Sequence, residues 1–208
     1  MSASPRRRSQ TAVDSQTAAG RLLLRRLLRQ HTLLLREVVE LRALRDFAYH
    51  DPLTGLRNAR YLGTRLHEEL QREGTPAGAL VVLDVEGFGS LNKRHGRKAG
   101  DRALVWLAGQ LGTAVRASDI CCRSGADEFA LILPDTDRAG AEVTAFRLIQ
   151  AAASARGERW LPLHLQVGIA TWPGDAGDAT SVVTLALRAL AADRSRQRGA
   201  GARLRLVP

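Results

Sequence analysis

Cysteine is almost absent from this sequence of 208 residues: the only two are Cys121 and Cys122, which are neighbours in the chain. They fall in a predicted strand, where consecutive side chains face opposite ways, and this geometry opposes a disulfide between them. The sequence therefore does not predict a disulfide-stabilised scaffold, and it gives no indication of an oxidising compartment.

Long hydrophobic runs are also missing. Arg21, Arg25, Arg26 and Arg29 interrupt the leucine-rich segment of residues 20–49, which therefore falls short of the ~20 apolar residues of a membrane span. The N-terminal residues lack the layout of a cleavable signal. We therefore expect a cytoplasmic protein without a transmembrane segment.

The central part of the chain has almost no net charge, although the whole carries +10. Residues 1–50 hold ten arginines and four acids, a net charge of +6, and residues 188–208 hold six arginines and one acid, a net charge of +5. For these basic tails a solvated arm is favoured over contact with nucleic acid or an anionic membrane. The partners of the central part must be inferred from its motifs.

The length suits one domain with an extension. Residues 1–19, which are rich in Ser, Thr, Ala, Gln and Arg, are predicted to form a disordered basic arm. Leucines at every seventh position predict an amphipathic helix over 20–49. This helix either packs on its own domain or joins two chains as a parallel coiled coil; the second is favoured, although His31 and Arg45 at seam positions weaken it.

Residues 50–208 interleave helical and strand patterns, which predicts an α/β (α+β) domain with a mixed central sheet covered by helices. The run 79–83 is continuously apolar and ends at Asp84, which is typical of a central strand with ligand groups at its end. The expected helices are 58–73, 98–115, 138–154 and 179–195, and the expected strands are 79–83, a hairpin over 120–133, 163–171 and 203–207.

The tip of the predicted hairpin carries two neighbouring carboxylates, Asp127 and Glu128, beside Gly125. Two such groups repel each other unless a cation lies against them. The tip is therefore a candidate metal or phosphate site, and the alternative is a pair of solvated turn acids.

Three ordered blocks of sequence resemble the GGDEF domain of the diguanylate cyclase family. Residues 51–56 read Asp-Pro-Leu-Thr-Gly-Leu, residues 84–101 resemble the next block, and residues 125–129 read Gly-Ala-Asp-Glu-Phe at the place of the name-giving motif. Residues 167–170 resemble the strand that follows. The resemblance, over about residues 50–195, implies the palm fold of nucleotide cyclases and the condensation of two GTP into cyclic di-GMP, a bacterial second messenger.

The resemblance also implies a metal site. Asp84 and Asp127, with the carbonyl of Val85, are the implied ligands of Mg²⁺ or Mn²⁺, and Glu128 has an implied metal or general-base role. Such an ion holds the triphosphate and lowers the charge barrier to attack by a 3′-hydroxyl. The alternative for Asp84 is a turn cap at the end of its strand.

Substrate contacts are implied in the same way. Asn92 and Asp101 are the implied guanine contacts, since an amide and a carboxylate match the donors and acceptors of that base. Phe88 and Gly125 lie in the matching blocks, and Arg194 stands in place of a phosphate-binding lysine. Taken alone, Asn92 would be a loop residue and Asp101 an acid in the first turn of a helix.

Arg116 and Asp119 form an RxxD pattern that ends five residues before Gly125. At this offset the resemblance implies an inhibitory site for the product: an arginine can fork onto a phosphate or stack on guanine, and an aspartate accepts hydrogen bonds from the base. The alternative is a surface ion pair.

The sequence departs from the family pattern at several positions. Ala126 replaces the second motif glycine, Gly89 stands where a lysine is expected, and Lys93 replaces an aspartate. Leu187 and Ala191 replace an aspartate and a tyrosine near the C-terminus. If position 126 requires a positive φ, alanine costs on the order of 1 kcal/mol there.

Three hypotheses follow. The first is an active diguanylate cyclase that works as a homodimer, because two GTP must face each other. The second is a degenerate, inactive domain that serves as a cyclic di-GMP receptor through Arg116 and Asp119. The third is a dimerisation or adaptor module with basic tails.

Overall fold

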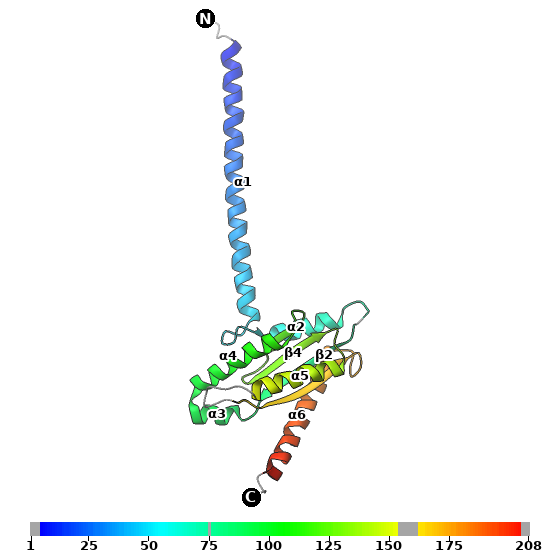
Figure 1. Ribbon diagram of the computed structural model, residues 1–208. Helices are drawn as coiled ribbons and strands as arrows, with labels where there is room; N and C mark the ends of the chain where they lie inside the picture. The colour runs from blue at the N-terminus through cyan, green and yellow to red at the C-terminus, as the bar shows by residue number, and fades with distance from the viewer. Residues whose placement is uncertain (1–4, 75, 154–161, 205–208) are drawn as a thin grey trace. The chain divides into compact units, whose positions relative to one another are not determined.

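The computed structural model describes residues 5–74, 76–153 and 162–204. The chain divides into two units, residues 1–47 and 48–208, and each is described by itself. Figure 1 shows the elements of both units. In the part of the chain that the structure describes, no helix has the length and apolar character needed to cross a membrane.

The first unit is helical, and its helix α1 spans Pro5–Tyr49. It begins at Pro5 and not at Gly20, so residues 5–19 are helical where a disordered arm was predicted; residues 1–4 lie outside the described residues. Proline suits the first position of a helix, and residues 6–19 contain neither glycine nor proline. From Leu22 to Leu44 every leucine and valine is exposed, by 42–70%. Pairing of this helix with a second chain stays a prediction.

The second unit is built on a five-stranded sheet in the order β1-β3-β4-β2-β5. Strand β2 lies at its centre and is antiparallel to both β4 and β5, whereas β1 and β3 are parallel. Because β2 has a strand on each side and helices over both faces, nearly all its residues are buried, which confirms the predicted central strand. The strands are β1 (Arg57–Asn58), β2 (Gly78–Val85), β3 (Ile120–Arg123), β4 (Glu128–Pro134) and β5 (Leu165–Trp172).

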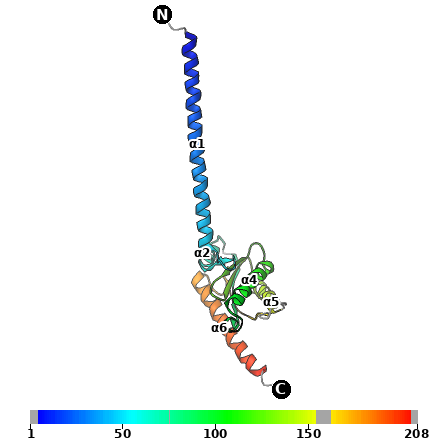
Figure 2. The same cartoon turned by 90° about the vertical axis from the view of Figure 1, so that its left-hand side faces the viewer.

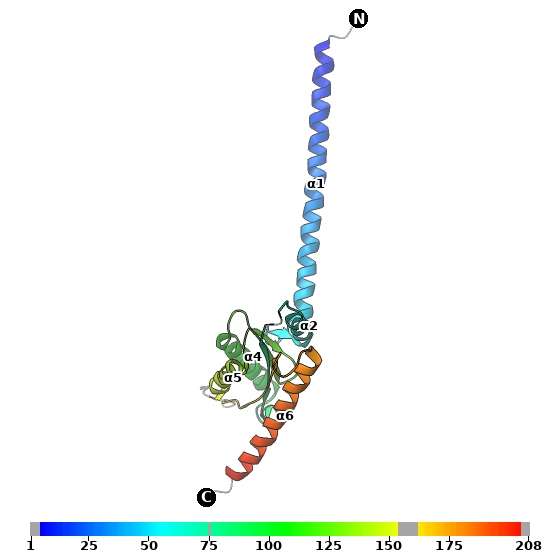
Figure 3. The same ribbon diagram turned by 90° about the vertical axis from the view of Figure 1, so that its right-hand side faces the viewer.

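Helices cover both faces of this sheet: α4 and α5 lie on one face, and α2 and α6 on the other (Figures 2 and 3). The sequence analysis expected no helix between the strand at 79–83 and the helix at 98–115, but α3 forms there, between Gly87 and Gly96. These two glycines have positive φ of 69° and 81°, a conformation that a side chain disfavours. The helices are α2 (Ala59–Leu70), α3 (Phe88–His95), α4 (Arg97–Ala114), α5 (Arg138–Ala153) and α6 (Ala179–Leu204).

The predicted last strand at 203–207 is wrong at its start, because Arg203 and Leu204 belong to α6. The residues of this prediction after Leu204 lie outside the described residues. Alanine and arginine make up seven of the 13 residues in the second half of α6, and both residues favour a helix.

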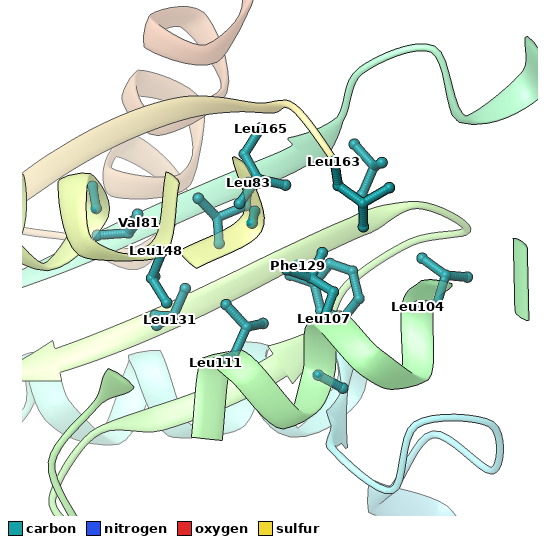
Figure 4. Packing of buried hydrophobic residues seen from close by; sticks show 14 of the residues in the cluster. Val81, Leu83, Leu104, Leu107, Leu111, Phe129, Leu131, Leu148, Leu163 and Leu165 are labelled. Atoms are coloured by element: carbon teal, nitrogen blue, oxygen red, sulfur yellow. The ribbon is translucent and has the colours of Figure 1, made fainter. Parts of the chain in front are cut away.

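Alternate residues of the strands feed two hydrophobic cores. Figure 4 shows the core beneath α4 and α5, where Val81, Leu83, Phe129 and Leu131 of the central strands meet helix side chains. The intervening residues of the same strands point to the opposite core beneath α2 and α6. That second core contains Leu66, Leu80, Val82, Ile132, Trp172, Val182 and Leu190.

Gly168 allows α6 to lie directly against β5. A Cβ at this position would be 2.0 Å from the carbonyl oxygen of Ala186 and 2.5 Å from the backbone nitrogen of Leu190. Backbone atoms in a packed helix cannot easily move aside, so only glycine fits. This close packing fixes the position of α6 on the sheet. Arg194 lies one helical turn after Leu190 on this helix.

Candidate active site

The candidate site lies where three strands end side by side. In the register of the sheet, Asp84 of β2 stands opposite Glu128 of β4 on one side and Gln166 of β5 on the other. The backbone N–H of Val85 also donates to the carbonyl oxygen of Asp127 at 3.2 Å. The structure thus brings the hairpin tip to the end of the central strand, where the family resemblance implied a shared site.

These strand ends surround a cavity of about 520 Å³. Four of the predicted site residues line it: Asp84, Asp127 and Glu128 from the strand ends and the hairpin tip, and Arg194 from α6. The remaining lining residues are Glu86, Gly87 and Gln166.

Arg194 is the cation that faces these carboxylates. Its Nη2 lies 2.5 Å from Oδ1 of Asp84 and 3.7 Å from Oε1 of Glu128, and its Nε donates to Oε1 of Gln166 at 3.1 Å. Gln166 is only 4% exposed. The sequence analysis missed this residue, because nothing in the local pattern of β5 shows that it meets a side chain from α6.

The cavity favours positive charge. Burial raises the pKa of Asp84, the carboxylates of Asp127 and Glu128 raise it further, and Arg194 opposes this increase. Within the described residues, no group of three or more His, Cys, Asp or Glu side chains forms a ready metal cage. Mg²⁺ prefers a few carboxylates together with phosphate oxygens, so the donor set of Asp84, Asp127 and Glu128 fits a divalent ion that arrives with a phosphate ligand.

A partly buried ion pair supports the hairpin tip. Nη1 of Arg123 donates to both carboxylate oxygens of Asp51, at 3.0 and 3.1 Å, and its Nη2 donates to the carbonyl oxygen of Ala126 at 2.6 Å. Asp51 in turn accepts hydrogen bonds from the backbone N–H and the hydroxyl of Thr54. The first sequence block therefore supports the tip through Arg123, a link that the sequence analysis missed.

The tip itself is a tight turn. Ser124 and Gly125 donate their N–H groups to the carbonyl oxygen of Glu128, and a Cβ on Gly125 would lie 2.8 Å from Oε2 of that residue. Among the described residues Asp135 is the only non-glycine with a positive φ. Ala126 therefore does not carry the backbone strain that the sequence analysis considered for this position.

The residues considered for guanine form a second group, where α3 meets α4. The Oδ1 atom of Asn92 is buried and accepts no hydrogen bond from the described residues. A Cβ on Gly100 would lie 2.0 Å from this oxygen and 3.0 Å from Cζ of Phe88. Gly100 thus makes room for Asn92, which holds an unsatisfied acceptor of the kind that a ligand donor can fill. Asp101 follows on the exposed side of α4.

Arg116 and Asp119 lie in the turn between α4 and β3. The backbone N–H of Arg116 donates to Oδ2 of Asp119 at 2.8 Å, and the N–H of Asp119 donates to the carbonyl oxygen of Arg116. Asp119 therefore caps its own turn, while the side chain of Arg116 is exposed. This arrangement differs from the surface ion pair that was the alternative.

The family model described as diguanylate cyclase, GGDEF domain, matches residues 48–200. The chain belongs to the GGDEF-domain family of diguanylate cyclases. The family that the sequence resembles is thereby confirmed.

Relatives of this GGDEF domain include two bacterial signalling proteins. Diguanylate cyclase DgcP of Pseudomonas aeruginosa is 36% identical over 142 residues, which cover 65% of this chain and 21% of DgcP. Response regulator PleD of Caulobacter vibrioides is 33% identical over 138 residues, which cover 62% of this chain and 30% of PleD. The chain therefore matches less than a third of the length of either relative.

A solved structure with the same fold is that of the coiled coil and GGDEF domain of DgcB from Caulobacter crescentus, in complex with c-di-GMP. It matches with a TM-score of 0.73 at 25% identity and covers 85% of this chain and 95% of that one. The predicted mixed α/β fold preceded by a long helix is thus confirmed.

Proposed function

We propose that this protein is a diguanylate cyclase, which condenses two GTP molecules into cyclic di-GMP with release of pyrophosphate. The observation that carries the proposal is the convergence of Asp84, Asp127 and Glu128 on one cavity beside a cationic side chain, in a chain of this family. That arrangement suits a triphosphate whose charge must be balanced while it reacts.

The three carboxylates take two roles in this proposal. Asp84 and Asp127, with the carbonyl of Val85, would hold Mg²⁺ or Mn²⁺, which would lower the charge barrier to attack of a 3′-hydroxyl on the phosphate. Glu128 completes the metal site or accepts the proton of that hydroxyl. Arg194 supplies a guanidinium that can fork onto a phosphate.

The base is bound at the α3–α4 junction. The unsatisfied Oδ1 of Asn92 accepts a hydrogen bond from guanine, and the carboxylate of Asp101 accepts from its N1 and N2 donors. Phe88 and Gly125 shape the approach of the nucleotide. Adenine presents a different set of donors and acceptors, so the proposal includes a preference for GTP over ATP.

Catalysis requires two chains, because each domain holds one GTP and both phosphodiester bonds form between facing nucleotides. The exposed leucines of α1 support a homodimer through a parallel coiled coil. The α1 helix would then set the distance between the two domains.

The test is product formation. Purified protein is incubated with GTP and Mg²⁺, and cyclic di-GMP is measured by chromatography and mass spectrometry, with Asp127→Asn as the matched control. Wild-type protein is expected to form the product and the variant to lose at least about 100-fold in rate. A wild-type protein that forms none at micromolar concentration would refute the proposal.

A second candidate function is that of a cyclic di-GMP receptor without turnover. The exposed Arg116, beside a carboxylate fixed by its own turn, supports it, and Gly89 in place of a lysine weakens the triphosphate site. Calorimetry with cyclic di-GMP on wild type and Arg116→Ala tests it. Binding of cyclic di-GMP by wild type alone supports an RxxD site, which would be inhibitory if the enzyme is active. Equal binding of cyclic di-GMP by both proteins excludes this site.

A further inference from the structure

We propose that Arg194, oriented by Gln166, is a built-in counter-ion that competes with a divalent cation for Asp84 and Glu128. The inference rests on the metal site of the proposed function and adds a regulation to it. The cation must displace Arg194 from its ion pair with these carboxylates. The displaced arginine then becomes available to the phosphates.

The first support is that Arg194 already forms an ion pair with Asp84, a predicted metal ligand. Nη2 lies 2.5 Å from Oδ1 of Asp84, in direct contact between opposite charges, and 3.7 Å from Oε1 of Glu128. The side chain of Asp84 is only 13% exposed, so water screens this pair less than it screens a surface ion pair. A cation that binds Asp84 must therefore break or share this contact.

The second support is the way in which Gln166 directs the guanidinium. That group is planar, so a hydrogen bond donated by Nε orients the plane and with it both terminal nitrogens. Gln166 makes this bond at 3.1 Å from the strand position next to Asp84. A buried glutamine thus aims Arg194 at the carboxylates, and it does so without a charge of its own.

The third support is the rigid base from which Arg194 extends. The neighbouring Asp193 accepts a hydrogen bond from the N–H of Val167 at 3.1 Å, which ties α6 to the edge of β5. Gly168 lets the two backbones pack closely one turn earlier. The arginine therefore reaches the carboxylates from a fixed point, and loss of Gln166 frees its side chain without moving the helix.

The experiment measures Mn²⁺ affinity without nucleotide, from the electron paramagnetic resonance signal of free Mn²⁺, on the full chain. The variants are Arg194→Met, which removes the charge, and Gln166→Leu, which keeps the charge and removes its anchor. Arg188→Met is the matched control, since Arg188 is an exposed arginine on the same helix that lines a different cavity.

We expect Arg194→Met to bind Mn²⁺ about five- to tenfold more tightly than wild type, as expected for removal of a partly buried ion pair. Gln166→Leu should bind about two- to threefold more tightly, and Arg188→Met should stay within about twofold of wild type. Equal or weaker binding by Arg194→Met overturns the inference. So does a control that gains as much as Arg194→Met, because the effect would then be one of net charge.

Measurements of thermal stability and of turnover distinguish a change in metal binding from a loss of folding stability or of enzyme activity. Thermal unfolding should show a larger stabilisation by Mn²⁺ in Arg194→Met than in wild type, even if that variant is less stable without metal. Asp84→Asn should abolish Mn²⁺ binding. If neither wild type nor Arg194→Met binds Mn²⁺, the inference falls. If the affinities change as expected while no protein forms cyclic di-GMP, the inference holds and the proposed enzyme activity fails.

Discussion

Replacement of Gly100 by alanine tests the proposed guanine site. The new Cβ would lie 2.0 Å from Oδ1 of Asn92, which is about 1.4 Å closer than an ordinary contact. The amide side chain must therefore turn away from its position, and the base loses a hydrogen-bond partner. An unmade bond of this kind costs about 1–3 kcal/mol, so GTP affinity should fall at least about fivefold.

Gly109→Ala is the matched control for this change. Gly109 lies in the same helix, α4, and a Cβ there meets no atom within 4 Å. Both substitutions replace glycine in a helix and gain up to about 1 kcal/mol of helix propensity. Titration with a fluorescent GTP analogue should therefore show weaker binding by Gly100→Ala alone. Equal affinities of the two variants would refute the role of Asn92.

Three further predictions concern the scaffold of the site. Gly168→Ala should lower the free energy of unfolding by about 3 kcal/mol in urea denaturation, because its Cβ would meet the α6 backbone at 2.0 Å, whereas Gly63→Ala, in open space, should not. Burial alone would raise the pKa of Asp51, but hydrogen bonds from Thr54 and Arg123 lower it overall. Ionised Asp51 therefore contributes about 1–3 kcal/mol to stability above its unfolded pKa of 3.8. This contribution is lost as the pH falls through the lower pKa of the folded state. The unfolding free energies of wild type and Asp51→Asn should therefore converge at acid pH. Ala126→Gly should lower stability by about 0.5–1 kcal/mol, since no strain is relieved; a gain in stability would contradict the geometry of the turn.

The sequence predicted those parts of the site that follow from local pattern. The continuous apolar run of β2 predicted a central strand with Asp84 at its end, and the glycine-centred turn predicted a hairpin that presents Asp127 and Glu128. Both predictions rest on the period of a strand and on turn chemistry, which need no knowledge of tertiary packing.

The parts that the sequence missed depend on partners far apart in the chain. Arg123 meets Asp51 across 72 residues, and Arg194 meets Gln166 across 28. Neither contact leaves a local signal, because an arginine in a strand or a helix looks the same with or without a distant carboxylate. Helix α3 was missed for a different reason: it has only eight residues, and its apolar side consists of the partly buried Phe88 and Leu91, too short a pattern to predict a helix.

The most direct test of the central claim is the stoichiometry of the reaction with GTP. The protein is incubated with Mg²⁺ and GTP, and pyrophosphate and cyclic di-GMP are measured over the same time course. Two pyrophosphates for each cyclic di-GMP, at a rate that falls at least about 100-fold in Asp84→Ala, is the result that we predict. Recovery of intact GTP, or equal rates in wild type and Asp84→Ala, would contradict the account.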